Sequence, residues 1–185
     1  AAWNGQVTRY YVTSGDATAL CIGDLVKIDG GSDGAGVRSV TRYAVTGPVC
    51  GAVVGVEPDA TALNTPQYRT ASTTRYVYVA DDPNILFEVE SNGSTGFATA
   101  DVGLNAEVSV AAGSTFTGAS GFTIDSSTTG TTATLTLKVV ELVQRPDNAV
   151  GQYSKWLVKL QSHQLASGSG TACLLYTSDA ADDTP

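Results

Sequence analysis

One histidine and one pair of glutamates are the residues of this chain whose types and spacing come closest to those of a catalytic site. His163 lies in the segment Gln-Ser-His-Gln-Leu, with no cluster of acidic residues, cysteines or other histidines around it. We therefore expect a hydrogen-bonded surface or interface histidine rather than a metal ligand or an acid–base group. Glu88 and Glu90 fall on one face of a predicted strand, and glycosidases use such carboxylate pairs. Alternating glutamates are more typical of a solvated strand face, which is the interpretation we adopt.

Other short motifs give no better support for catalysis. Asp29 and Asp33 stand in the glycine-rich stretch 29–36, which has the composition of a calcium loop but lacks the ligand spacing of an EF-hand. We expect an exposed loop there. The sequence contains no phosphate-binding Gly-x-x-x-x-Gly-Lys and no His-x-x-x-His. The prediction is a protein that is not an enzyme and that uses no cofactor or metal.

The three cysteines indicate neither a zinc site nor a disulfide framework. Cys21, Cys50 and Cys173 form no Cys-x-x-Cys pair, and their number is odd. Cys21 and Cys50 are surrounded by apolar residues, so we expect both to be buried free thiols.

Charge and composition exclude two classes of partner. The chain has 185 residues and a formal net charge of −8, whereas a nucleic-acid-binding surface needs clustered Lys and Arg. No stretch approaches the roughly 20 apolar residues of a membrane-spanning helix. Neither nucleic acid nor membrane is expected as a partner. Charged residues make up only 15% of the chain and there are 20 glycines, which favours short strands joined by tight turns.

The segment 75–90 is the clearest element signal and predicts a β-hairpin. Aromatic and β-branched residues occupy 76–79, Asp-Asp-Pro-Asn at 81–84 is turn chemistry, and Phe-Glu-Val-Glu at 87–90 alternates apolar with charged. Tyr76 and Tyr78 share one face of the first strand. That face is either an interface rich in tyrosines or part of a sheet-on-sheet core.

The rest of the chain repeats the pattern of strands and turns without an amphipathic helix. One helical turn is expected within 98–104. We expect about ten to twelve strands in an all-β fold, a single antiparallel β-sandwich or β-barrel domain with long Gly/Ser/Thr-rich loops. The remaining strands are predicted at 7–13, 18–22, 25–28, 37–45, 49–56, 105–110, 122–125, 133–143 and 155–160.

The two ends of the chain differ in character from its body. The segment 173–185 begins Cys-Leu-Leu-Tyr-Thr-Ser-Asp-Ala-Ala-Asp, which resembles the conceptual translation of a sequencing adapter. We expect it to be a non-native tail following a single β-rich domain at 1–172. The chain starts at Ala1 without an initiator methionine, and we expect its N-terminus to be truncated.

Seven short motifs, taken in order, resemble a family of structural proteins of environmental tailed bacteriophages. The likeness extends from about Trp3 to Ala172. Each motif is common by itself, and it is their order and spacing that carry the resemblance. They are Trp-Asn-Gly-Gln at 3–6, Gly-Asp-Leu-Val-Lys at 23–27, Val-Ala-Asp-Asp-Pro at 79–83, Phe-Glu-Val at 87–89, Val-Gly-Leu-Asn-Ala at 102–106, Arg-Pro-Asp-Asn at 145–148 and Leu-Val-Lys-Leu at 157–160.

The resemblance implies a virion protein, a head decoration or cement protein on the capsid surface. Its expected partner is the major capsid protein, whose assembled shell it would stabilise by binding. Because the shell is symmetric, the resemblance also implies a homo-oligomer, a trimer or a dimer. Two alternatives remain open at this point: another virion component such as a head fibre, tail or adhesion module, and a carbohydrate-binding β-sandwich or glycosidase fragment.

Aromatic and arginine side chains are enriched in protein interfaces, and they supply the candidate contact residues. One group lies near the predicted first strand, one on the tyrosine-bearing strand and one in the C-terminal segment. We predict capsid or oligomer contacts at Trp3, Arg9, Tyr10, Tyr76, Tyr78, Trp156 and His163.

Overall fold

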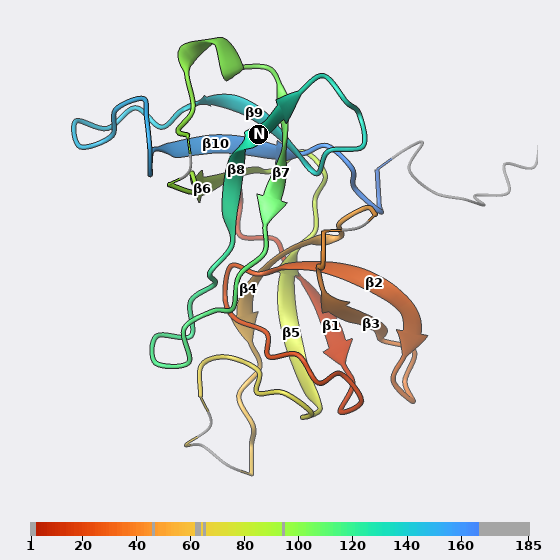
Figure 1. The fold of residues 1–185 in the computed structure, drawn as a ribbon. Coiled ribbons are helices and arrows are strands. Elements are labelled where there is room, and N and C mark those ends of the chain that lie inside the picture. Colours follow the sequence, from red (N-terminus) through yellow and green to blue (C-terminus); the bar gives the residue numbers. More distant parts are fainter. Residues whose placement is uncertain (1–2, 46, 62–63, 65, 94, 167–185) are drawn as a thin grey trace, which may run out of the picture.

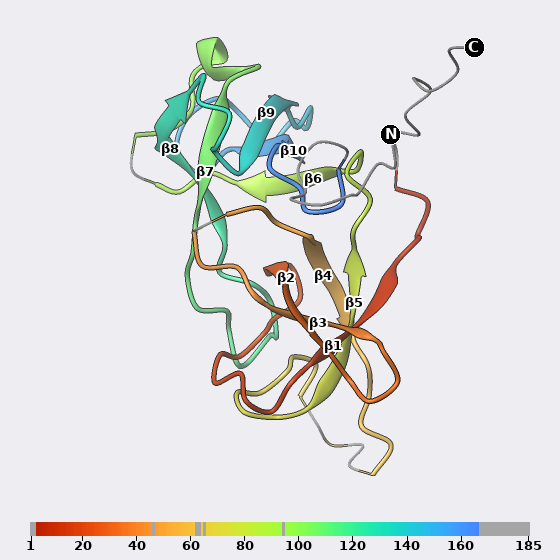
Figure 2. The same cartoon turned by 90° about the vertical axis from the view of Figure 1, so that its right-hand side faces the viewer.

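A computed structural model describes residues 3–45, 47–61, 64, 66–93 and 95–166, and it confirms the all-β fold class. Figure 1 shows a closed barrel in the lower half of the molecule and a second sheet above it, and Figure 2 shows the same two layers from the side. The barrel strands are β1 (Thr8–Val12), β2 (Leu25–Ser32), β3 (Arg38–Arg42), β4 (Gly51–Val56) and β5 (Arg75–Ala80). The second sheet contains β6 (Leu86–Glu90), β7 (Asn105–Ser109), β8 (Thr123–Gly130), β9 (Leu137–Leu142) and β10 (Lys155–Leu160), with the single 3-10 turn η1 (Thr99–Asp101) before β7.

The barrel closes because its strands carry apolar side chains on alternate positions. The strand order is β1-β3-β2-β4-β5, and β1 pairs with β5 to complete the ring. The β1–β3 pair is parallel, while the other pairings of the described strands are antiparallel. Val12, Val53, Val77 and Val79 are fully buried in the interior, so every second residue of the flanking strands points outward.

A second apolar cluster joins the two layers. It combines Leu25 and Ala52 of the barrel with side chains of the second sheet such as Leu137, Trp156 and Val158. The order of that sheet is β6-β10-β9-β7-β8. One face of the second sheet is therefore buried against the barrel, which fixes the side of each strand that faces solvent.

The predicted hairpin at 75–90 is wrong in its pairing, although its two strands and its turn exist. β5 pairs with β1 and β4 of the barrel, whereas β6 pairs with β10 of the second sheet. Asp82 organises the connection by accepting the Asn84 N–H at 2.8 Å and, through its carbonyl, the Ile85 N–H at 3.2 Å. The turn thus carries the chain from one layer to the other. Local alternation indicates a strand but not its partner.

Two further expectations need correction. The stretch 29–36 was predicted as a loop, but β2 continues to Ser32 through an irregular register after Ile28. Gly30 accommodates this bend with a φ of +87°, which side chains rarely tolerate. The predicted strand at 18–22 consists instead of isolated bridges from Leu20 and Ile22.

The tail at 173–185 lies outside the described residues. Within the described part of the chain no helix is long and apolar enough to cross a bilayer.

The corner between residue 20 and β2 contains a buried carboxylate that ties the barrel to the second sheet. Asp24 is fully buried, and its side chain accepts the Cys21 N–H at 2.8 Å and the Ser120 hydroxyl at 2.5 Å. The guanidinium of Arg42, on β3, lies 3.5 Å from the same carboxylate. Gly23 precedes it with a φ of +95°, and a Cβ there would sit 3.1 Å from the Cβ of Ser120. The Gly-Asp motif therefore has a structural reason: a left-handed turn followed by an anion with three partners.

Asp24→Ala is expected to lower the free energy of unfolding by about 3 to 5 kcal/mol, because it leaves the Arg42 charge without its buried partner. Urea denaturation followed by the fluorescence of buried Trp156 measures this change. Asp147→Ala, which removes an exposed carboxylate from the loop before β10, is the matched control and is expected to shift stability by about 0.5 kcal/mol or less. Equal stability of the two variants would contradict the anchoring role of Asp24.

Candidate functional site

The structure divides the seven predicted contact residues into an exposed and a buried group. Trp3, Arg9, Tyr76 and Tyr78 are exposed or half-buried. Trp3 is 48% exposed and precedes β1, where its indole N–H donates to the Gln6 carbonyl at 3.0 Å. Only the exposed group can contribute to a contact surface of the folded chain.

The prediction that Tyr10 is a contact residue is wrong, because Tyr10 belongs to the barrel interior. The alternation along β1 turns Tyr10 and Val12 inward and Arg9 and Tyr11 outward. The Tyr10 hydroxyl donates to the Asp81 carboxylate at 2.8 Å and lies 3.4 Å from the Cys50 sulfur. Burial raises the pKa of this phenol far above its ordinary value, so it stays protonated. Tyr10 thus supports the barrel and does not reach a partner.

Trp156 and His163 are also interior residues rather than contact residues. Trp156 lies on the inward face of β10, with its ring 5.3 Å from that of Phe97 and its N–H donating to the Ser154 hydroxyl at 2.8 Å. The expected surface histidine is wrong, because His163 is only 1% exposed and its Nδ1 accepts the Leu165 N–H at 3.0 Å. Burial lowers the pKa of His163, which favours the neutral ring.

The exposed residues of β1 and β5 form one continuous surface, which we call the tyrosine face and define as Arg9, Tyr11, Tyr76 and Tyr78. In the β1–β5 register Arg9 is opposite Tyr78, and Tyr11 is opposite Tyr76. These residues point outward because Val77 and Val79 fill the barrel. The alternative that Tyr76 and Tyr78 are core residues is thereby excluded.

Close contacts brace the tyrosine face. The Arg9 guanidinium donates to both carboxylate oxygens of Glu57, at 2.6 and 3.0 Å, and its central carbon lies 3.5 Å from the centre of the Tyr76 ring. The rings of Tyr11 and Tyr76 are 5.7 Å apart and tilted by 56°. The hydroxyl of Tyr78 donates to Glu57 at 3.3 Å. Bidentate, cation–π and tilted aromatic contacts each restrict the rotamers of the side chains that make them.

Asp33 fixes the far end of the tyrosine face from the β2–β3 turn. One carboxylate oxygen accepts the N–H groups of Ala35 and Val37, each at 2.8 Å, and the other accepts the Tyr76 hydroxyl at 2.6 Å. Asp29 likewise accepts the Gly31 N–H at 3.1 Å and a hydrogen bond from Ser39. These aspartates organise a turn, and in the described part of the chain no group of three His, Cys, Asp or Glu residues is arranged to hold a metal ion.

The electrostatics of the tyrosine face keep its carboxylates ionised. The hydrogen bond from Arg9 lowers the pKa of Glu57, and the one from Tyr76 lowers the pKa of Asp33. The partners shift the opposite way, since Glu57 raises the pKa of Arg9 and Asp33 raises that of Tyr76. At neutral pH the tyrosine face and the two carboxylates that contact it, Glu57 and Asp33, therefore combine one cation, two anions and three phenol rings.

The other candidate groups have structural partners. Glu88 forms an ion pair with Arg145. Glu88 and Glu90 both lie on the solvent-exposed face of β6. Cys21 and Cys50 are buried free thiols, as predicted, and burial raises the pKa of both.

Sequence reasoning missed three members of this site. Tyr11 could have been found from the alternation of β1, because it shares a side with Arg9. Glu57 and Asp33 carry no such signal, since they come from a loop after β4 and from a turn, 48 and 43 residues away in sequence from the side chains they contact.

Comparison with known proteins adds no relative: no protein-family model, curated protein or solved structure gives a significant match to this chain.

The Arg9–Glu57 pair is expected to titrate below the ordinary glutamate pKa of 4.5, because Arg9 favours the ionised carboxylate. A depressed pKa contributes stability above pH 4.5 that is lost as pH falls through the folded value. Carboxyl-carbon NMR of Glu57 measures the midpoint directly. In Arg9→Gln the midpoint is expected to move up towards 4.5, and an unchanged midpoint would show that the pair does not exist in solution.

Proposed function

We propose that this chain is a virion structural protein of a tailed bacteriophage, a capsid decoration or cement protein that binds the major capsid protein through the tyrosine face. The observation that carries the proposal is the rigid, outward aromatic–arginine surface of Arg9, Tyr11, Tyr76 and Tyr78 on a closed barrel. The resemblance of the sequence to structural proteins of tailed phages supports the choice of partner.

The tyrosine face has the composition of the energetically important centre of an interface. Tyr and Arg are enriched among residues whose truncation weakens binding most. Because Glu57 and Asp33 already hold Arg9, Tyr76 and Tyr78, little rotamer freedom remains to be lost on association. A surface ordered before binding keeps more of its contact energy as affinity.

Binding to the assembled shell would stabilise that shell by mass action. A protein that binds only the assembled lattice lowers its free energy by an amount set by the affinity and the free concentration. The copies would follow the local symmetry of the lattice as a trimer or dimer on the capsid surface. Trp3, exposed ahead of β1, is the candidate for contacts between neighbouring copies.

The double variant Tyr76→Ala, Tyr78→Ala is expected to bind capsids stripped of this protein at least about a hundredfold more weakly than the parent, because two aromatic anchors are lost. Co-sedimentation of purified protein with such capsids measures the affinity. The circular dichroism and cooperative unfolding of the variant are expected to persist, since both rings lie outside the barrel core.

Tyr153→Ala is the matched control, because Tyr153 is 63% exposed and lies in the loop before β10, outside the tyrosine face. It is expected to bind as tightly as the parent. Parent-like binding by the double variant, with the fold intact, would remove the tyrosine face from the contact surface.

A further inference from the structure

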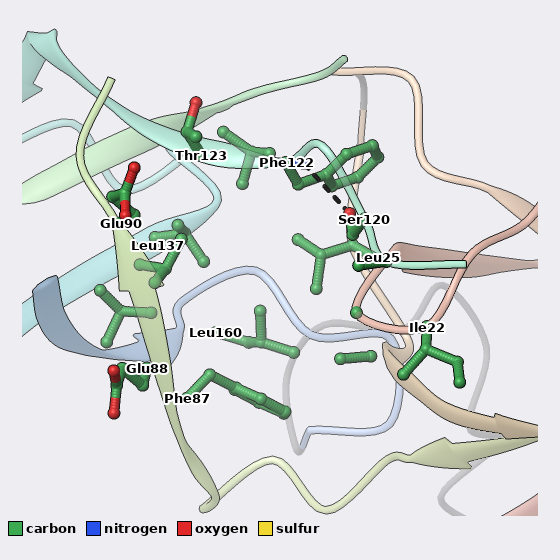
Figure 3. Close-up of a pocket in the computed structure, with 16 residues that line it drawn as sticks. Ile22, Leu25, Phe87, Glu88, Glu90, Ser120, Phe122, Thr123, Leu137 and Leu160 are labelled. Carbon is green, nitrogen blue, oxygen red and sulfur yellow. Dashed lines mark hydrogen bonds between the residues drawn. The ribbon is translucent and has the colours of Figure 1, made fainter. Parts of the chain in front are cut away.

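An apolar cleft opens where the second sheet fails to close on itself. The edge strands β6 and β8 meet at one bridge, Ser91 to Ile124, with the Asn92 N–H donating to the Ile124 carbonyl at 2.9 Å. On the barrel side of that bridge the strands separate, and a space of about 330 Å³ lies between β6 and the segment that leads into β8 (Figure 3).

The walls of this cleft come from both layers and are mainly apolar. Leu25 supplies the barrel wall, Leu137 and Leu160 supply the sheet wall, and Phe87 and Phe122 form the two lips. The two phenylalanines are only partly buried, and Ile22 at the mouth is 36% exposed. The cleft therefore presents apolar surface to solvent beside a strand edge.

The open edge of β6 faces this space. The Ser91 N–H donates to the Ser154 carbonyl on the β10 side, at 2.8 Å, whereas the Asn92 N–H points to β8. Backbone groups of successive strand residues alternate between the two sides, so the N–H and C=O of Glu88 face the β8 side. Among the described strands, β6 is paired along its length with β10 alone. Glu88 thus offers a donor and an acceptor towards the cleft.

The side chains of β6 specify what could lie beside it. Phe87 and Val89 line the cleft. Figure 3 shows that the carboxylates of Glu88 and Glu90 point away from it. Residues on the same face of adjacent strands contact one another in pairs. A strand added here would place alternate residues against the apolar wall and the intervening residues beside two glutamates.

We propose that the cleft binds an extended segment of a partner protein as an added strand on β6, with apolar residues alternating with Lys or Arg. Backbone hydrogen bonds to Glu88 supply the affinity common to added strands, and the apolar wall selects the inward side chains. Lys or Arg beside Glu90 complements a chain whose formal net charge is −8. Glu88 already pairs with Arg145, so Glu90 is the main charge determinant.

This inference does not depend on the capsid proposal. The cleft belongs to the second sheet and the tyrosine face to the barrel, so separate variants test them. A chain that binds a strand at β6 and does not bind capsids would refute only the capsid proposal.

The test uses the full chain and the capped peptide acetyl-Val-Lys-Val-Lys-Val-amide, whose length matches the five residues of β6. Isothermal titration calorimetry is expected to show saturable binding. Amide NMR is expected to show shifts confined to β6 and 118–124, with the Glu88 amide protected from exchange. A peptide with every backbone amide N-methylated cannot donate to Glu88 in either strand direction and is expected to bind at least about tenfold more weakly.

Two variants test the charge requirement. Glu90→Lys is expected to weaken binding of the lysine peptide about threefold to tenfold and to favour the corresponding Val-Glu-Val-Glu-Val peptide. Asp147→Lys makes the same change of charge in an exposed loop outside the cleft and is expected to leave both affinities unchanged. Absence of saturable binding at millimolar peptide, or equal binding of the N-methylated peptide, would overturn strand addition. Binding insensitive to Glu90→Lys would overturn the requirement for basic residues.

Discussion

The buried carboxylate of Asp24 is the constraint on which the relation between barrel and second sheet depends. A buried carboxylate needs partners. Asp24 accepts hydrogen bonds from the Cys21 backbone and from Ser120 before β8, and the Arg42 guanidinium of β3 lies 3.5 Å away as its ion-pair partner. Arg42 in turn donates to the Ala111 carbonyl and lies 4.9 Å from the centre of the Phe122 ring. These contacts hold the segment that forms one lip of the cleft against the barrel. Apolar burial between the layers supplies most of the driving force, and the carboxylate sets the position in which the layers meet.

Closure of the barrel has a direct consequence for binding. Filling its interior with Tyr10, Val12, Val77 and Val79 forces the alternate residues of β1 and β5 onto the outside. There they lie opposite one another in register, which brings an arginine and three tyrosines into contact. Packing of the barrel interior therefore places the residues of the candidate site on the outer surface. Glu57 and Asp33, which lie outside β1 and β5, then fix these side chains by hydrogen bonds.

Period-two alternation allowed most of the strands to be predicted from the sequence, and the β10 range was predicted without error. Pairing could not be predicted, because hydrogen bonds between strands depend on contacts distant in sequence. The segment 75–90 shows this limit: its strands are local properties, but their partners β1, β4 and β10 are not. The contact residues show a second limit. Residue type alone predicted Tyr10 and Trp156 as contact residues together with Arg9 and Tyr76. Whether a strand residue lies in the core or on the surface depends on the side of the strand to which it points. The unpaired edge of β6 carries no sequence signal, since it results from the failure of β6 and β8 to meet beyond one bridge.

The proposal that this protein is a stoichiometric component of a capsid is decided by its copy number in virus particles. Quantitative mass spectrometry of purified virus particles would compare this chain with the major capsid protein. A decoration protein is expected at a ratio near one, or at a simple fraction set by the local symmetry of the shell. A few copies per particle would place the protein at the neck or tail. Absence from particles would contradict the virion assignment altogether.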